Sequence, residues 1–242
     1  MRFNGWQRLC NFHETHRQKQ VHASRLLVRI AGGLAFALGL NCITIFSTRA
    51  GDLTPAFEVH VINLTEATPG TITSAEAEAG RILRDAGLKV VWLNCPREQA
   101  VPDPADRCQQ PFGPANVFLR VLSDQTKKGF QDTIFGFAVL PALASVYYGS
   151  AVDLARAFRT EGMDVPTILG GAMAHEIGHL LLGLDSHSPI GIMQAHWGRK
   201  QVRELLKRNL LFTGEQSRQI RAEWQTRMKL DAARNHTTDS IS

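Results

Sequence analysis

The segment HEIGH, residues 175–179, has the pattern HExxH. Residues four apart on an α-helix lie on the same face about one turn apart, so His175 and His179 can each place an imidazole nitrogen about 2.0–2.1 Å from one zinc ion. Glu176 lies between them, where it can accept a proton from a zinc-bound water without being a ligand itself. The spacing therefore predicts a zinc site with a general base. The alternative is a pair of histidines packed in the core.

A third ligand is available shortly after this motif. Gly183 follows His179 by four residues and can end the helix and turn the chain back toward the metal. His187 comes eight residues after His179. With His175, His179 and His187 as ligands, the fourth coordination position of Zn²⁺ would stay open for water, as catalytic zinc requires.

The motif lies in a predicted helix over 167–182, which follows Asp164 and has Pro166 near its first turn. Apart from the two histidines and the glutamate, this segment is almost wholly apolar. A helix that is apolar nearly all round belongs inside a domain, so its polar side chains need partners. We therefore expect the three polar residues to form a functional site.

The stretch HEIGHLLLGLDSHSPIGIM, residues 175–193, resembles the metzincin clan of zinc metallopeptidases, in which HExxHxxGxxH precedes a methionine-containing turn below the metal. The residues match in order, but Gly183 comes one residue late and His187 two residues late. The resemblance implies a zinc-dependent endopeptidase with Met193 as an apolar floor below the metal. Some members of the clan use aspartate as the third ligand, which makes Asp185 the alternative to His187.

Three alternatives stay open beside this interpretation. Several members of the clan place a tyrosine after the methionine to support the oxyanion; this sequence has His196 there, as an oxyanion donor or as a residue outside the reaction. A gluzincin-type peptidase would use Glu204 as its third ligand, although the short turn to His187 and Met193 argue against it. A non-catalytic zinc-binding or partner-binding module could have the same ligands, but the presence of Glu176 favours the enzyme.

The segments around the motif predict an α+β fold with a mixed, mostly parallel twisted sheet. Alternating apolar residues and turn signals give a strand–helix–strand unit, a third strand and then two more strands. The resemblance implies an antiparallel edge strand at Phe135–Leu140, where a peptide substrate would bind by strand addition. The predicted strands are 57–64, 88–93, 116–122, 133–140 and 145–152; the other predicted helices are 73–86, capped by Thr73 or Ser74 and ended by Gly87, then 198–212, and 213–230 with a Thr213–Gln216 capping box.

Residues 1–50 differ in composition from the rest of the chain. They hold seven basic residues and one acidic residue, and residues 30–46 form an apolar stretch without charge. A basic segment, an apolar stretch and small residues after it are typical of a secretory signal or of an uncleaved membrane anchor. We expect an exported protein, secreted or periplasmic, or one tethered to a membrane through 30–46, with a single metallopeptidase domain over 51–242 and C-terminal helices at about 198–230.

The composition excludes several classes of protein. With 44% hydrophobic residues, the chain is neither disordered nor a multi-span membrane protein. The net charge of +5 comes from the leader and from 199–234, while 51–198 is acidic. The charge therefore gives no reason to expect nucleic acid as a partner, and a peptide or protein substrate is expected instead.

Two of the four cysteines, Cys95 and Cys108, lie outside the leader and flank a loop rich in proline and charge. In an oxidising compartment such a pair forms a disulfide, which would contribute about 3 kcal/mol for a loop of this length. A metal or redox site of the Cys-x-x-Cys type would need closer spacing.

Overall fold

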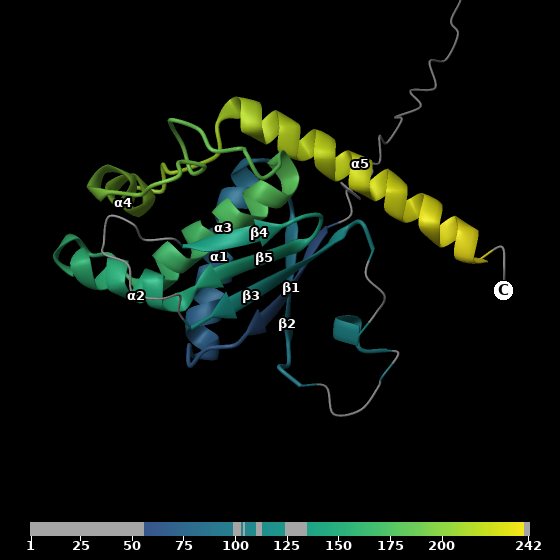
Figure 1. Ribbon diagram of the computed structural model, residues 1–242, viewed down its shortest axis with the longest axis horizontal. Helices are drawn as coiled ribbons and strands as arrows, with labels where there is room; N and C mark the ends of the chain where they lie inside the picture. The colour runs from purple at the N-terminus through teal and green to yellow at the C-terminus, as the bar shows by residue number, and fades with distance from the viewer. Residues whose placement is uncertain (1–55, 99–102, 104, 110–112, 124–134, 240–242) are drawn as a thin grey trace, which may run out of the picture. The chain divides into compact units, whose positions relative to one another are not determined.

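The computed structural model describes residues 56–98, 103, 105–109, 113–123 and 135–239 (Figure 1). The predicted leader, residues 1–50, and its apolar stretch 30–46 lie outside the described residues. Of the helices that the structure describes, none is long and apolar enough to cross a membrane.

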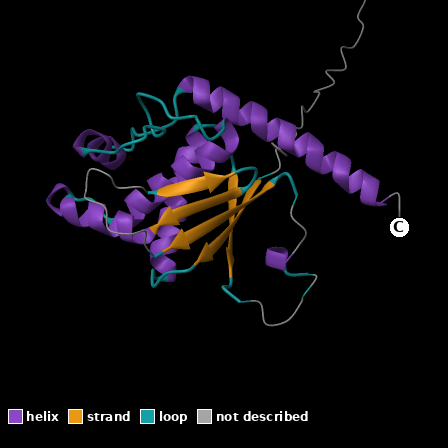
Figure 2. Cartoon of the chain, in the orientation of Figure 1, coloured by secondary structure: helices purple, strands orange, loops and turns teal. Residues whose placement is uncertain are grey.

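A five-stranded sheet in the order β2-β1-β3-β5-β4 forms one layer of the domain (Figure 2). Strand β1 pairs in parallel with β2 and β3, and β3 pairs in parallel with β5. The edge strand β4 runs antiparallel to β5. The predicted mostly parallel sheet with an antiparallel edge is confirmed. The strands are β1 (Phe57–Asn63), β2 (Val90–Cys95), β3 (Asn116–Leu122), β4 (Gly136–Val139) and β5 (Leu143–Tyr147).

Helices cover one face of this sheet, as Figure 2 shows. Helix α1 packs against α3, and α3 packs on β4 and β5. Helices α2, α4 and α5 contact α3 in turn. The helix that carries HExxH is therefore at the centre of the domain. The helices are α1 (Pro69–Asp85), α2 (Tyr148–Ala157), α3 (Val165–Leu182), α4 (Arg199–Leu206) and α5 (Gly214–Asp239).

Alternation along the strands explains which face of the sheet is buried. In β3, Val117, Leu119 and Val121 are fully buried, whereas the residues between them are partly exposed. Their side chains belong to the same buried core as those of α3, on which every residue from Ile168 to Leu181 is buried. Burying one such aliphatic side chain contributes about 1.5–3 kcal/mol, so these contacts fix α3 on the sheet.

Helix α1 begins about one turn earlier than predicted. Its cap is Thr68, whose hydroxyl accepts a hydrogen bond from the Thr71 amide at 3.2 Å, and not Thr73 or Ser74. Pro69 explains the earlier start, because proline has the backbone angle of a first helical residue and needs no hydrogen-bond acceptor there. The predicted end is confirmed: Gly87 follows the helix with a φ of 94°.

The predicted strand over 145–152 is wrong beyond Tyr147. Strand β5 pairs with β3 only as far as Leu122 and Tyr147, and the chain then forms α2. The apolar residues after Tyr147 recur at helical spacing, and Ala151, Leu154 and Ala155 are buried. Periodicity over so short a segment did not separate the strand from the helix.

The C-terminal helices differ from prediction in length. Helix α4 ends at Leu206, where Arg208 has a φ of 62° and the Asn209 amide donates back to the Glu204 carbonyl at 2.8 Å. Helix α5 continues to Asp239 instead of ending near 230. The predicted capping box is confirmed by reciprocal bonds between Thr213 and Gln216, of 2.9 and 3.2 Å.

The predicted disulfide is also confirmed: Cys95, at the end of β2, is bonded to Cys108 in a short 3₁₀ helix, η1 (Arg107–Gln109).

Candidate metal centre and active site

Helix α3 carries the two predicted histidine ligands on one face. Its N-terminus is capped by Asp164, whose carboxylate accepts from the Thr167 amide at 2.8 Å. Gly183 ends the helix with a φ of 99°, and its amide donates to the His179 carbonyl at 3.0 Å. A positive φ of this kind favours glycine, so the chain turns immediately after the motif.

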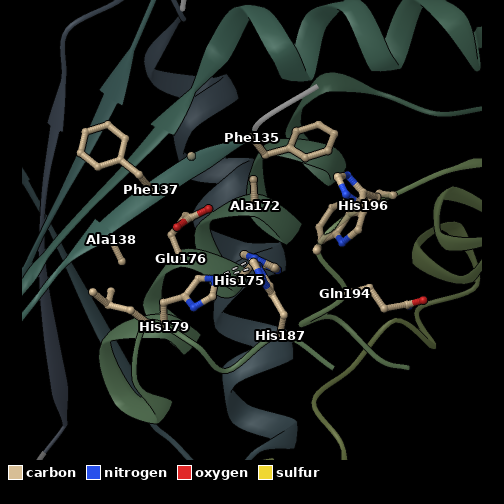
Figure 3. A pocket seen from close by; sticks show the side chains of 14 residues that line it. Phe135, Phe137, Ala138, Ala172, His175, Glu176, His179, His187, Gln194 and His196 are labelled. Atoms are coloured by element: carbon tan, nitrogen blue, oxygen red, sulfur yellow. Dashed lines mark hydrogen bonds between the residues drawn. The ribbon is translucent and has the colours of Figure 1, made fainter. Parts of the chain in front are cut away.

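Three histidine side chains converge beside the end of α3. The Nε2 atom of His179 lies 3.1 Å from Nε2 of His175 and 3.2 Å from Nε2 of His187. Figure 3 shows the three rings facing one another. The structure thus brings together the three residues that the sequence selected.

Both alternative ligands lie outside this group of histidines. Asp185 is exposed and, among the described residues, belongs to no cluster with metal-binding spacing. The carboxylate of Glu204 pairs with the ammonium group of Lys207 at 3.6 Å and lies outside the cleft that the histidines line.

In two of these histidines, the hydrogen-bond partners of Nδ1 affect which ring nitrogen is available to a metal. Nδ1 of His175 donates to the Ile192 carbonyl at 2.8 Å, and Nδ1 of His179 lies 3.4 Å from the Gly183 carbonyl and 3.1 Å from the Ser186 hydroxyl. A neutral imidazole with its proton on Nδ1 has only a lone pair on Nε2. With the proton of each ring on Nδ1, the Nε2 atoms of these two rings present lone pairs to each other.

A cation between these atoms would remove the repulsion between their lone pairs. Tetrahedral zinc with nitrogen ligands at about 2.0–2.1 Å would hold them about 3.3 Å apart. The observed separations of 3.1 and 3.2 Å are close to that value. The donor set and its spacing therefore fit Zn²⁺.

Burial keeps two of the histidines neutral. His175 and His179 are 8% and 7% exposed. Burial is the main cause that lowers the pKa of His175 to about 4, and it also lowers the pKa of His179. Both shifts favour the neutral imidazole, which is the form that binds a metal. His187 is exposed at the mouth of the cleft.

The turn after His187, which contains Met193, packs against α3. The Ser188 amide donates to the Met193 carbonyl at 2.9 Å, and Met193 is fully buried. A Cβ atom added to Gly178 would lie 2.6 Å from Sδ of Met193 and 2.8 Å from Phe212. The glycine of the HExxH segment therefore allows Met193 to pack against α3 next to His179.

Glu176 lies in the same cleft and is 4% exposed. Burial raises the pKa of its carboxyl group to about 8. A divalent cation nearby would oppose this shift, because positive charge favours the ionised carboxylate. Strand β4 lies directly against Glu176: a Cβ atom on Gly136 would be 2.7 Å from Cγ and 2.8 Å from Oε1 of the glutamate.

A cleft of about 450 Å³ lies between β4 and the segment after the Met193 turn (Figure 3). His196 lines the cleft with an exposed side chain. Trp197 closes it beside His175, with ring centroids 6.0 Å apart, and its indole nitrogen donates to the Ile192 carbonyl at 3.3 Å. The lining residues are Phe135–Ala138, Ala172, His175, Glu176, His179, Leu184, His187 and Gln194–Trp197.

Two residues of this site, Gly136 and Trp197, were not predicted from the sequence. A glycine inside a predicted strand often marks a close backbone approach, and this signal could have identified Gly136. No local pattern identifies Trp197, whose role depends on sharing the Ile192 carbonyl with His175.

Comparison with known proteins gives little further guidance. No family model matches the chain, and no curated protein matches its sequence. Among solved structures, a zinc-dependent peptidase from Methanocorpusculum labreanum (strain Z) is similar, with 18% identity and a TM-score of 0.44, over 67% of this chain and 99% of that chain. Because both values are low, this similarity does not indicate the function of the chain.

Proposed function

We propose that this protein is a zinc-dependent endopeptidase in which His175, His179 and His187 bind Zn²⁺ and Glu176 is the general base. The observation that carries this proposal is the convergence of three imidazole Nε2 atoms, at 3.1 and 3.2 Å, in a cleft that also contains Glu176. Two of the imidazoles have their Nδ1 atoms on partners outside the cluster, which leaves Nε2 for a metal.

The residues of the chain have distinct roles in this reaction. Bound Zn²⁺ would acidify the attacking water and polarise the scissile carbonyl. Glu176, held between α3 and the backbone of β4, would accept a proton from that water and donate it to the leaving amine. Trp197 and the apolar residues of β4 would limit access of bulk water to the carboxylate.

Strand β4 is the expected binding site for the substrate. It is one of the two edge strands of the described sheet and pairs with β5 on one side, while Phe135–Ala138 line the cleft. A peptide in extended conformation could add to the free edge of β4 by backbone hydrogen bonds and so present its carbonyl to the metal. Phe137 and Val139, 37% and 48% exposed, would contact its side chains.

We also propose that the protein is exported, with residues 1–50 acting as a signal or as a membrane anchor. The composition of the leader and the Cys95–Cys108 disulfide support an oxidising compartment. The expected partner is a peptide or protein substrate, without nucleic acid.

Zinc content and hydrolysis of a degenerate peptide library test the proposal. The purified full chain should bind about one zinc and cleave peptides. Glu176→Gln should keep the zinc and lose about 10²–10⁴-fold in rate, the usual contribution of a general base. His175→Ala should lose the metal. Stoichiometric zinc in His175→Ala, or equal cleavage by Glu176→Gln and the parent protein, would contradict the proposal.

Two further outcomes separate the alternatives. Glu204→Gln is the matched control for Glu176→Gln; it should keep both zinc and activity, whereas a gluzincin-type site would lose them. A non-catalytic zinc-binding module would bind zinc in the parent protein and cleave nothing.

A further inference from the structure

A buried histidine lies beside the disulfide, away from the proposed metal centre. His60, in β1, is 2% exposed. It alternates along the strand with Val59 and Val61, whose side chains belong to the core, so it lies on the opposite face of the sheet. Its ring packs against Phe118 of β3, with centroids 5.3 Å apart. The proposed peptidase reaction makes no use of this histidine.

The charged and polar groups around His60 form a row that ends at the disulfide. Nε2 of His60 lies 2.9 Å from Oε1 of Glu58, and Nδ1 lies 3.8 Å from Sγ of Cys95. Arg107, next to Cys108 in sequence, forms an ion pair with the other oxygen of Glu58. Nδ2 of Asn116 lies 3.3 Å from Nε2 of His60 and 3.4 Å from Oε1 of Glu58.

This order of groups determines which ring nitrogen faces the sulfur as an acceptor. A carboxylate only accepts hydrogen bonds, so Nε2 of His60 carries the proton and donates to Glu58. In the neutral ring, Nδ1 then points a lone pair at Cys95. Carboxylate, imidazole and sulfur thus stand in the relation of orienting group, base and nucleophile.

We propose that Cys95–Cys108 is a thiol–disulfide exchange site for low-molecular-weight thiols, with Cys95 as the leaving sulfur and His60 as its proton acceptor and donor. Ligand atoms of His60, Cys95 and Cys108 all lie within 4.8 Å of one another, and both cysteine residues are only partly buried. A purely structural disulfide needs no imidazole oriented by a carboxylate beside one of its sulfurs.

The exchange proceeds in two balanced steps. A thiolate RS⁻ attacks Sγ of Cys108, the RS–Sγ bond forms, and the Sγ–Sγ bond breaks with its electron pair on Cys95. The proton released when RSH ionises is held between Nδ1 of His60 and the Cys95 sulfur. A second RSH then attacks the mixed disulfide and leaves as RSSR, so two thiols are oxidised and the protein disulfide is reduced to a dithiol.

Reduced glutathione is the probe for a test on the full chain. Samples are quenched by alkylation and digested with trypsin, which separates Cys95 in peptide 90–97 from Cys108 in peptide 108–120. The parent protein should form the glutathione adduct on peptide 108–120. At pH 7, His60→Gln should slow reduction about tenfold, and Glu58→Gln should slow it less.

The reduced protein gives a second readout. Cys95 should react with iodoacetamide about tenfold faster in the parent protein than in His60→Gln, because the imidazole stabilises its thiolate. His196→Gln is the matched control for this readout, and its Cys95 should react with iodoacetamide at the rate of the parent protein. An adduct on peptide 90–97, or equal rates in the parent protein and in both the His60 and Glu58 variants, would overturn the proposal. The Glu58 variant keeps the test decisive if His60→Gln fails to fold.

Discussion

The two histidines on α3, His175 and His179, each use their two ring nitrogens differently. In His175 the Nδ1 atom is bound to the backbone carbonyl of Ile192, which belongs to the turn that contains Met193. In His179 it lies beside the Gly183 carbonyl, at the turn that ends α3. The same residues that reverse the chain thus orient the rings, so the direction of each Nε2 atom results from where the backbone turns.

The third ligand is tested by a pair of variants at the residue scale. His187→Ala should weaken zinc binding by more than 100-fold, because it removes one of three imidazoles, whereas Asp185→Ala should leave the affinity unchanged. Competition with a chromophoric zinc chelator measures both. A loss of zinc affinity in Asp185→Ala and not in His187→Ala would assign the third ligand to Asp185.

At the scale of elements, the contact of β4 with α3 sets the position of Glu176. Gly136 leaves room for the carboxylate beside the β4 backbone, and a Cβ atom there would also lie 2.3 Å from the Ser145 carbonyl. Strand and helix are therefore packed so closely that one methyl group would disturb both of them.

Gly136→Ala should lower the rate of hydrolysis about 10–100-fold while zinc stays bound, because the general base moves and the ligands do not. Zinc content and steady-state kinetics on the same preparation measure this effect. Gly70→Ala is the control, since its Cβ would meet only Oγ1 of Thr68, at 3.9 Å, and its rate should not change. Full activity of Gly136→Ala would show that the close contact has no part in catalysis.

The packing of α1 on β2 predicts a pH dependence of stability. Glu76 is buried in α1; Asn94 donates to its Oε2 at 3.3 Å, and Oε1 has no hydrogen-bond partner among the described residues. Burial raises the pKa of Glu76 from 4.5 to about 7. The folded state therefore holds more protons between these values, and the stabilisation that is complete below pH 4.5 is lost as the pH rises through 7.

Glu76→Gln removes this titration and should increase the free energy of unfolding by about 1–2 kcal/mol at pH 8, with the gain disappearing near pH 4.5. Urea unfolding at several pH values measures the difference. Glu66→Gln, an exposed glutamate, is the control and should give the same small difference at each pH. A gain for Glu76→Gln that does not vary with pH would contradict the assignment.

At the scale of the whole molecule, α5 connects the end of α3 to the turn between β4 and β5. Arg227 of α5 is 7% exposed, and its guanidinium donates to the Leu180 carbonyl at 2.6 Å and to the Pro141 carbonyl at 3.1 Å. It also pairs with Glu223 at 2.8 Å. One buried side chain thus joins α3, the turn between β4 and β5, and α5.

Arg227→Met should lower the free energy of unfolding by about 2–4 kcal/mol, because it leaves buried carbonyls unpaired. Arg218→Met is the control: Arg218 is exposed and pairs with Glu215 on the same helix, so its removal should cost less than about 0.5 kcal/mol. Equal effects in chemical denaturation would show that Arg227 does not join these elements.

Local patterns were sufficient for much of the fold. Strand β3 has its predicted bounds, and α3 differs from prediction only by two residues at its start, because alternation and apolar content over these segments are unambiguous. Several predicted ends were wrong, including those of α4 and α5. Helix α1 begins at a proline before its predicted start, and β5 ends where the sheet no longer offers a partner to Tyr147.

The sequence by itself placed His175, Glu176 and His179 together, because spacing along one helix is a local property, and it left His187 and Asp185 as alternatives for the third ligand. It also determined that Cys95 and Cys108 could pair. Only the tertiary structure decided that β4 lies against Glu176 and that His60 faces Cys95. Gly136 and Glu176 are about 40 residues apart along the chain, and His60 and Cys95 are 35 apart. No periodicity in the sequence predicts contacts over such separations.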